Sequence, residues 1–430
     1  MITPVDAPPA QPPHEGAWYA HRGALFSGGN EVTLLTGGDE LFPAMRAAIA
    51  RARHEIWLAT YIFHDDVAAR AVVEALVAAA RRGVRVRVVV DGFGSKASLP
   101  ALRRWFDGSG VALAVFRPID RWYAWLQPGQ LRRLHQKLLA TDSEHAFVGG
   151  INIIDDRNDL NHGISAAPRL DFAVALRGPV VAPVAQTARA MWTRAAFGRD
   201  WRDEVIALAR SAEPVARARA LMQRLRVSAG PEALGPDTAP VHAAFLVRDN
   251  LRQRRAIERS YIEALRRARG RIDLVSSYFY PGRLFRRTLR DAARRGVQVR
   301  LLLQGKLDYR FAGLAASVLY DELLSRGVRI YEYTPAFLHA KVALVDDDWA
   351  TVGSSNIDPL SLLLNLEANV VVRDIAFTAS LAAAFEQAIA VSREVTAPPA
   401  APGWMAAMRR AFVAWVAQWY LRLAGITGRY

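Results

Sequence analysis

The chain has 430 residues, 52% of them hydrophobic and 23% charged, which excludes a disordered protein and suits two globular domains. Its formal net charge of +15 favours an anionic partner such as a nucleic acid, an anionic lipid surface or a phosphorylated substrate. It contains no cysteine, which excludes disulfides, cysteine-ligated zinc and thiol catalysis.

The first element in the chain is a predicted disordered leader, residues 1–28. Its opening stretch MITPVDAPPAQPPHEG is rich in proline and lacks the basic and apolar blocks of a signal peptide. Nowhere does the sequence offer the roughly 18 uninterrupted apolar residues that a membrane-spanning helix needs. We therefore expect any contact with a membrane to be peripheral.

Two nearly identical segments indicate an internal repeat. AARRGVRVRVVVDG covers residues 79–92 and AARRGVQVRLLLQG covers 292–305, and each predicts a helix end, a glycine stop and a buried strand. The runs EIWLATYIF and RIDLVSSYFYPG precede them, with an amphipathic helix between. Strand, helix, strand twice over predicts a parallel α/β architecture. The halves are expected at 29–195 and 240–395, joined by a helical linker at 196–239.

A second repeated pattern combines His, Lys, Asp, Gly and Asn at one spacing. It reads RLHQKLLATDSEHAFVGGINIID in the first half and FLHAKVALVDDDWATVGSSNID in the second. The positions are His135, Lys137, Asp142, Gly149, Asn152 and His339, Lys341, Asp346, Gly353, Asn356. Because residues i and i+2 of a strand point to one face, each His and Lys should enter one site together. A hairpin turning at the Asp should bring the Asn towards them.

These residue types suit the chemistry of a phosphodiester. Cleavage needs a nucleophile, a proton for the leaving oxygen and positive charge around the phosphoryl oxygens, and two His and two Lys supply all of these without a metal. Lysine is also scarce, since only four of the 56 basic residues are Lys and two of them stand in the motifs. We therefore predict that His, Lys and Asp of both motifs are catalytic, with no metal and no cofactor, although the turn position of the two Asp residues suggests a role in hairpin geometry more than in proton transfer. One copy alone could be an ordinary polar strand, but the duplication argues against that interpretation.

Both copies match in full the double His-x-Lys-x4-Asp-x6-Gly-x2-Asn signature of the phospholipase D superfamily. The stretches YIFHDD, SSYFYPG, DFAVALRGPVV and NIDPLSLLLNLE resemble the bacterial cardiolipin synthases, of the short type without N-terminal transmembrane helices. This resemblance implies two homologous phospholipase D-like α/β/α domains with mixed sheets. It also implies one active site at their pseudo-twofold interface, with one His from each half.

The resemblance implies a phosphatidyltransferase that works through a phosphohistidine intermediate. His135 would attack the phosphorus of phosphatidylglycerol or phosphatidylethanolamine, and His339 would protonate the departing alcohol and then activate a phosphatidylglycerol acceptor. The product would be cardiolipin, made peripherally at the cytoplasmic face of the bacterial inner membrane. Water as the acceptor would give a phospholipase D instead, and a metal-independent nuclease is a further alternative. The branch resemblance favours lipid over nucleic acid as the partner.

Two acidic residues are expected to orient the histidines. Asp171 and Glu367 each open the strand that follows a motif, at similar positions in the two repeats. A carboxylate bonded to one imidazole nitrogen fixes the tautomer and leaves the other nitrogen free to react. The alternative is a solvated acid at a strand end.

Several further polar residues are expected to bind the substrate. Asn152, Asn356 and Ser354 belong to the motif segments. Lys96 and Lys306 both follow the duplicated strand, at the carboxyl end where α/β proteins place ligands, and would attract phosphate headgroups. An ordinary solvated lysine is the alternative for these last two.

The last segment, 396–430, is predicted to be an amphipathic helical tail. Its apolar positions recur at spacings of three and four and are Trp404, Met408, Phe412, Trp415, Trp419 and Leu423. Arginines and no acidic residue accompany them from 401 onward, which favours an anionic membrane interface, although packing on the protein's own core is the alternative. The insertion RWYAWLQPG, residues 121–129, is expected to form a rim that dips towards lipid.

Overall fold

The computed structural model describes most of both predicted halves. The described residues are 24–119, 132–159, 163–209, 241–249, 253–305, 319–358, 361 and 365–396, and for 197–209 only the backbone. The insertion at 121–129, Lys306 and the apolar stripe of the tail lie outside them, so the predictions made for these segments stay predictions.

The first half is a seven-stranded mixed sheet in the order β1-β9-β6-β5-β2-β3-β4. Its elements are β1 (Glu31–Thr36), α1 (Gly37–Arg51), β2 (Glu55–Thr60), α2 (Val67–Arg81), β3 (Arg85–Asp91), η2 (Lys96–Ser98), α3 (Leu99–Phe106), β4 (Ala112–Phe116), β5 (Leu138–Thr141), β6 (His145–Gly149), β7 (Asn158–Asp159), β8 (Gly163–Ile164), β9 (Phe172–Arg177) and α4 (Val181–Ala209). Strands β2, β3 and β4 are parallel, and the others pair antiparallel. The predicted domain boundary at residue 195 falls inside α4.

The second half repeats this arrangement in an eight-stranded sheet, β10-β16-β15-β14-β11-β12-β13-β17. Its elements are β10 (His242–Arg248), α6 (Ala256–Arg267), β11 (Arg271–Ser276), α7 (Arg283–Arg294), β12 (Gln298–Gln304), β13 (Arg329–Tyr333), β14 (Lys341–Val345), β15 (Trp349–Gly353), β16 (Glu367–Arg373), α10 (Ile375–Ala390) and β17 (Ser392–Glu394). Seven of its strands correspond in order to those of the first sheet, and β17 extends the edge. The prediction of two homologous α/β halves with mixed sheets is confirmed.

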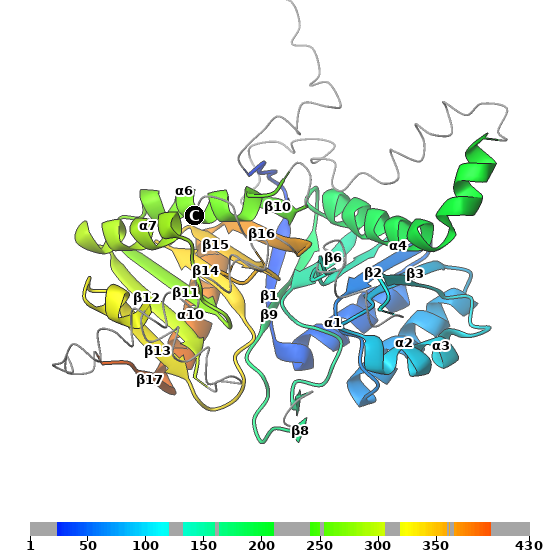
Figure 1. The fold of residues 1–430 in the computed structure, drawn as a ribbon, viewed down its shortest axis with the longest axis horizontal. Helices are drawn as coiled ribbons and strands as arrows, with labels where there is room; N and C mark the ends of the chain where they lie inside the picture. Colours follow the sequence, from blue (N-terminus) through cyan, green and yellow to red (C-terminus); the bar gives the residue numbers. More distant parts are fainter. Residues whose placement is uncertain are drawn as a thin grey trace, which may run out of the picture.

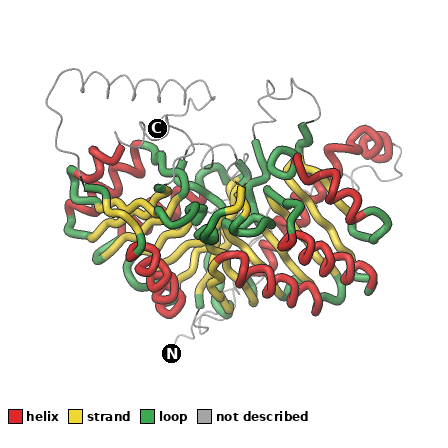
Figure 2. Tube along the Cα trace, turned by 90° about the horizontal axis from the view of Figure 1, so that it is seen from below, coloured by secondary structure: helices red, strands yellow, loops and turns green. Residues whose placement is uncertain are grey.

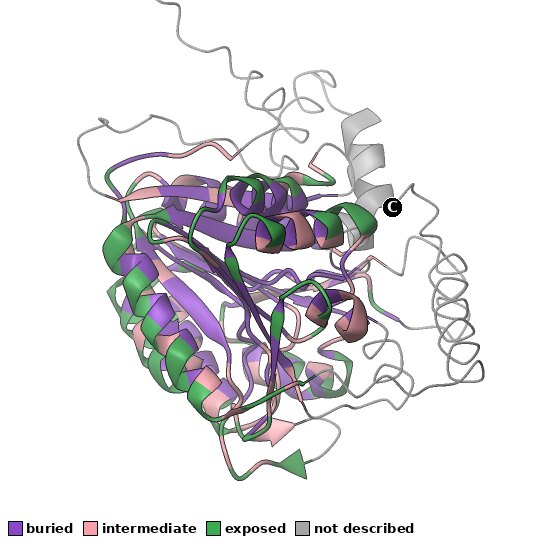
Figure 3. Ribbon diagram, turned by 90° about the vertical axis from the view of Figure 1, so that its left-hand side faces the viewer, coloured by how far each residue is buried: buried purple, intermediate pink, exposed green. Residues whose placement is uncertain are grey.

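Local sequence explains how the repeated helices begin and end. The Asp66 side chain caps α2 by accepting the N–H of Ala69. Gly83 and Gly296, the predicted glycine stops, have φ of +88° and +89°, a conformation that glycine adopts without strain. The helices then turn their apolar residues towards the sheets and leave their polar faces exposed, as the alternating colours in Figure 3 show.

The two halves share a hydrophobic core. One cluster of buried side chains contains Leu138 and Val174 from the first half and Val342 and Val370 from the second. Separate clusters fill the space between each sheet and its outer helices, α1 to α3 in one half and α6 and α7 in the other. Figures 1 and 2 show the strands of both halves running through the middle of the molecule, with helices outside. Within the described residues, no helix combines the length and apolarity needed to cross a membrane.

Candidate active site

Each motif forms an antiparallel hairpin, β5–β6 and β14–β15, that turns at its Asp. Asp142 and Asp346 have φ of +53° and +52°. Asp142 accepts the N–H groups of residues 53–55 and Asp346 those of residues 269–271, where β2 and β11 begin. These carboxylates lie at the opposite end of the hairpin strand from the His and Lys. Their acceptor atoms hold the turn, which fits the role in hairpin geometry that their position in the sequence suggests, and their catalytic assignment stays a prediction.

The motif glycines permit close approach of neighbouring strands. A Cβ added to Gly149 would lie 2.5 Å from Cα of Ala173, and one added to Gly353 would lie 2.3 Å from Cγ of Asn369. The motif Asn follows three residues later in each half. Asn152 is buried, and its Oδ1 accepts the N–H of Ile62 at 3.2 Å. The glycine in the signature is thus a packing requirement.

Backbone bonds that cross between the halves bring the two histidines to one interface. The His135 N–H donates to the carbonyl of Leu366 at 3.0 Å, and the His339 N–H donates to that of Leu170 at 2.8 Å. The segment before each His therefore pairs with the segment before the other half's acidic residue. The two backbone hydrogen bonds join equivalent positions of the two halves, as a pseudo-twofold arrangement requires.

Each His is bonded to a carboxylate from the other half. His135 Nδ1 lies 3.0 Å from Glu367 Oε2, and His339 Nδ1 lies 2.6 Å from Asp171 Oδ2. Both carboxylates are buried, with side-chain exposures of 0% and 1%. The histidine side chains are 12% and 24% exposed, so His339 is the more accessible of the two. These are the contacts that the predicted orienting role of the acids requires, and the exchange of partners between the halves is an added finding.

Burial and nearby cations act on the histidine charge. Burial lowers the pKa of His135, and Glu367 offsets part of this effect. The pKa of His339 lies well below its usual value, first because of burial and then because of Lys341 and Arg169. Burial also raises the pKa of Asp171, to about 7, against the opposing effect of Lys341.

The motif lysines are buried beside the histidines. Lys137 donates to the carbonyl of His135 at 2.7 Å, and Lys341 donates to the carbonyl of His339. Burial lowers the pKa of Lys137 to about 7, with Lys341 as the next cause, and lowers that of Lys341 to about 8, partly offset by Asp171. Near neutral pH each lysine is therefore present in both its charged and its uncharged form.

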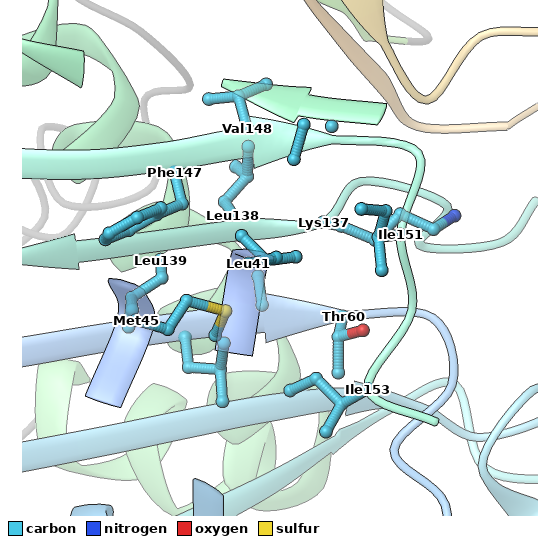
Figure 4. A pocket seen from close by; sticks show the side chains of 14 residues that line it. Leu41, Met45, Thr60, Lys137, Leu138, Leu139, Phe147, Val148, Ile151 and Ile153 are labelled. Atoms are coloured by element: carbon cyan, nitrogen blue, oxygen red, sulfur yellow. The ribbon is translucent and has the colours of Figure 1, made fainter. Parts of the chain in front are cut away.

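A small cavity of about 20 Å³ lies beneath the first motif, between the sheet and α1. Figure 4 shows the stem of Lys137 along its wall, with the nitrogen directed away from Met45, Leu139 and Phe147. The lining is almost entirely apolar and the space fits about one water molecule. This cavity is therefore a packing defect of the apolar core, and the polar groups of the site lie outside it.

The hydroxyl of Ser354 is buried against Glu367. Ser354 is fully buried, its Oγ donates to Glu367 Oε2 at 2.5 Å, and its carbonyl oxygen lies 3.2 Å from His135 Nδ1. Both groups contact the His135–Glu367 pair, and the substrate contact expected of Ser354 stays a prediction. The counterpart in the first half is Gly150, where a Cβ would lie 2.2 Å from Asp171 Oδ1. The two histidine sites therefore differ at this position.

Two residues beside the site were not singled out from the sequence. The ring of Tyr61 packs at 5.0 Å from that of His135 and 5.4 Å from the Lys137 nitrogen, measured to the ring centre. Asp91, fully buried at the end of β3, accepts the N–H of Leu134 and fixes the residue before His135. Tyr61 follows β2 directly and Asp91 is the last residue of β3, so their place at the carboxyl ends of repeated strands was the signal available in the sequence.

The remaining predicted residues take different positions. Lys96 is exposed at the start of η2, after the carboxyl end of β3. Asn356 is buried, and its Oδ1 has no hydrogen-bond partner among the described residues. Lys306 is outside the described residues. In the described ranges, no three His, Cys, Asp or Glu residues are grouped so as to hold a metal ion.

Comparisons with known proteins cover both halves. The family model described as "Cardiolipin synthase, PLD-like domain" matches residues 45–167 and 261–389. Cardiolipin synthase B of Salmonella typhi is 37% identical over 353 residues, 82% of this chain and 79% of its own. Cardiolipin synthase B of Escherichia coli K12 is 36% identical over 356 residues, with the same coverage. The solved phosphatidylserine synthase of Haemophilus influenzae has a TM-score of 0.64 at 11% identity, over 95% of this chain and 97% of that one, a likeness of fold alone.

Proposed function

The chain belongs to the cardiolipin synthase family with PLD-like domains and is a phosphatidyltransferase, and we propose that it makes cardiolipin through a phosphohistidine intermediate. The observation that carries this proposal is the pair of histidines at the interface, each with Nδ1 bonded to a carboxylate of the other half. Such bonding leaves Nε2 of each His available for chemistry.

His135 is the proposed nucleophile. The carbonyl oxygen of Ser354 can only accept a hydrogen bond, so its approach to His135 Nδ1 favours the tautomer with the proton on that nitrogen. Burial keeps the ring neutral by lowering its pKa. Nε2 then carries a free lone pair that attacks phosphorus.

His339 is the proposed acid and base. Its partner Asp171, with a pKa raised by burial to about 7, takes up a proton near neutral pH. Whether that proton rests on Asp171 or on the Nδ1 it faces, Nε2 of His339 carries a hydrogen. This hydrogen is donated to the oxygen that leaves, and the same nitrogen later removes the proton of the acceptor hydroxyl.

The complete reaction has two displacements at one phosphorus. The bond from phosphorus to the headgroup oxygen of the donor breaks as the bond to His135 forms, and the alcohol departs with the proton from His339. The glycerol hydroxyl of phosphatidylglycerol then displaces His135. Phosphatidylglycerol or phosphatidylethanolamine serves as the donor. Lys137 and Lys341 in their charged forms stabilise the phosphoryl oxygens.

Other groups would complete the lipid site. The unpartnered Oδ1 of Asn356 suits a hydroxyl donor on the acceptor glycerol. We propose that Asn152 positions the loop after β2, and that Lys96, with Lys306, attracts headgroup phosphates to the entrance. The enzyme would work as a peripheral protein at the cytoplasmic face of the inner membrane, with the tail at 396–430 as one contact.

The test is product analysis with the purified full chain. Phosphatidylglycerol vesicles are incubated with enzyme and EDTA, and lipids and glycerol are followed by mass spectrometry. We expect cardiolipin and glycerol in equal amounts, lost by at least a thousandfold in His135→Ala and in His339→Ala. His145→Ala is the matched control, because His145 lies at the hairpin turn, away from the site.

The nucleophile is identified by trapping. A phosphatidyl ester of p-nitrophenol needs no proton on its leaving group, so His339→Ala should still form an acid-labile adduct on His135. An adduct on His339 in the His135→Ala variant would reverse the assignment. Phosphatidic acid without cardiolipin would establish a phospholipase, and absence of any lipid product, with cleavage of DNA, would establish a nuclease.

A further inference from the structure

The helices on the outer face of the second sheet are far more basic than their counterparts in the first half. Together α6 and α7 carry eight arginines and three acidic residues, whereas α1 and α2 carry four arginines and three acidic residues. The two pairs occupy equivalent places in the duplicated fold. The packing of the fold therefore does not require the additional arginines.

The basic side chains form one exposed surface. The helices pack against each other and lie along the upper edge of the second half in Figure 1. Their inner sides are buried, through residues such as Leu265, Phe285 and Leu289. The outer side, here named the α6–α7 arginine face, consists of the exposed residues Arg259, Arg266, Arg267, Arg283, Arg287 and Arg294.

Acidic neighbours neutralise little of this face. Arg287 and Arg294 both contact the single carboxylate of Asp291, each at 3.6 Å. These are exposed pairs, which are weak in water and free to exchange partners. A clear excess of positive charge thus faces solvent.

One end of the face adjoins the active site. The loop between β11 and α7 is joined to the segment after Asn356 by the bridge between Phe279 and Ile357 and by the N–H of Tyr280, which donates to the Ile357 carbonyl at 2.7 Å. At this same end, Tyr278 and Leu284 are 48% and 46% exposed, which is unusual for large apolar side chains on a helix start and its loop. The charged surface therefore ends in an exposed apolar edge next to the second motif.

We propose that the α6–α7 arginine face docks on an anionic phospholipid bilayer, with its guanidinium groups on lipid phosphates and Leu284 at the headgroup boundary. Arginine binds phosphate with two parallel hydrogen bonds, and basic residues near an anionic leaflet each add to membrane affinity. Apolar side chains at the rim of a basic surface suit a bilayer better than a nucleic acid. The inference rests on the proposed function, because docking here would present bilayer lipids to the adjoining site.

The structure supplies a matched pair of variants for the test. Arg259→Gln, Arg266→Gln, Arg287→Gln and Arg294→Gln together remove four charges from the face. Arg46→Gln, Arg51→Gln, Arg70→Gln and Arg81→Gln remove four exposed charges from the counterpart helices α1 and α2. Both variants therefore have the same net charge, and thermal unfolding verifies that both are folded.

Binding of the full chain is measured by co-sedimentation with vesicles of one part phosphatidylglycerol to two parts phosphatidylcholine, in EDTA at low and high salt. We expect the face variant to bind at least tenfold more weakly than the wild type at low salt, and the control variant to stay within about threefold. Equal weakening in both variants would mean that only net charge matters and would overturn the proposal. Unchanged vesicle binding by the face variant would also overturn the proposal, and so would a face variant that loses DNA binding but keeps vesicle binding.

Turnover separates this proposal from the proposed function. In neutral detergent micelles that hold phosphatidylglycerol at a low mole fraction, the surface charge density is small and there is no bilayer to dock on. The face variant should therefore match the wild type in micelles, while its turnover on vesicles should fall at least fivefold. A wild type that makes no cardiolipin in either system would refute the synthase function. The vesicle-binding comparison would still show whether the α6–α7 arginine face binds the bilayer. Equal losses in micelles and vesicles would overturn the docking role.

Discussion

Two buried lysines set the charge of the site at the scale of single residues. In water the Lys pKa lies near 10.4, but burial brings it to about 7 for Lys137 and about 8 for Lys341. Only the protonated forms supply positive charge to the phosphoryl oxygens. Catalysis therefore requires the charged form of each lysine, whereas burial favours the uncharged form. Opposed effects of this kind are typical of functional sites.

The activity should consequently fall on the alkaline side at unusually low pH. Raising the pH through 7 and then 8 removes the charge of Lys137 and then of Lys341, so kcat/KM should decline between pH 7 and 9. Measured kcat/KM from pH 6 to 9.5 checks this. Lys137→Arg stays charged, so its profile should lose the part of the decline near pH 7 that Lys137 causes and keep the part due to Asp171 and His339, from a rate at least tenfold lower. A wild-type profile that is flat to pH 9.5 would contradict the assignment.

The exchanged carboxylates give a second prediction at this scale. Glu367→Gln can offer an N–H to His135 Nδ1 and thereby stabilise the wrong tautomer, and Asp171→Asn has no proton to pass to His339 Nδ1 when Nε2 gives up its hydrogen. We expect kcat to fall by about 10² to 10⁴ with KM changed less than about threefold. Glu386→Gln, which alters an ion pair with Arg300, is the control and should keep its activity. A rise in KM alone, without loss of kcat, would argue that the carboxylates do not orient the histidines.

The hairpin is the relevant unit at the scale of elements. Burial opposes ionisation of Asp142, but the N–H groups of Arg53, Glu55 and His54 outweigh it and hold the pKa of Asp142 below its usual value. Its contribution to stability is therefore present above the unfolded-state pKa, near 3.9, and is lost as the pH falls below it. The positive φ adds a preference for Asp or Asn at this position.

Removal of this turn acceptor should reduce stability and spare catalysis. Asp142→Ala leaves three backbone N–H groups without the carboxylate and places Ala in the left-handed region, so the free energy of unfolding at pH 7 should fall by about 2 kcal/mol. Asp142→Asn should lose about half as much. Urea unfolding measures both, and kcat/KM of the folded variants should stay within about threefold of the wild type. A thousandfold loss of kcat/KM would restore a catalytic role.

The shared core matters at the scale of the whole molecule. Strands β5, β6 and β9 of one half and β14, β15 and β16 of the other contribute to one buried cluster, and each half supplies the carboxylate that the other half's His needs. Neither half can bury this surface or complete its site alone. The site therefore exists only in the assembled pair.

The halves should accordingly unfold together. Calorimetry of the full chain should give one transition, with the van't Hoff enthalpy near the calorimetric enthalpy. Val342→Ala, in the shared cluster, should move that single transition down by about 2–4 °C. Two separated transitions in the wild type, only one of which responds to Val342→Ala, would show independent halves.

Sequence determined the parts of this protein that depend on local spacing. The two α/β halves and the glycine stops at Gly83 and Gly296 follow from periodicity and repetition. Such relations are fixed within a few residues along the chain. They could be predicted before any packing was known.

Tertiary structure alone decided which group meets which across the interface. His135 and Glu367 are 232 residues apart and His339 and Asp171 are 168 apart, so only the packing of the halves could exchange their partners. The same packing turned Ser354 inward onto Glu367 and brought Tyr61 against His135. A residue type and its spacing state what a side chain can do, but its neighbours in space decide what it does.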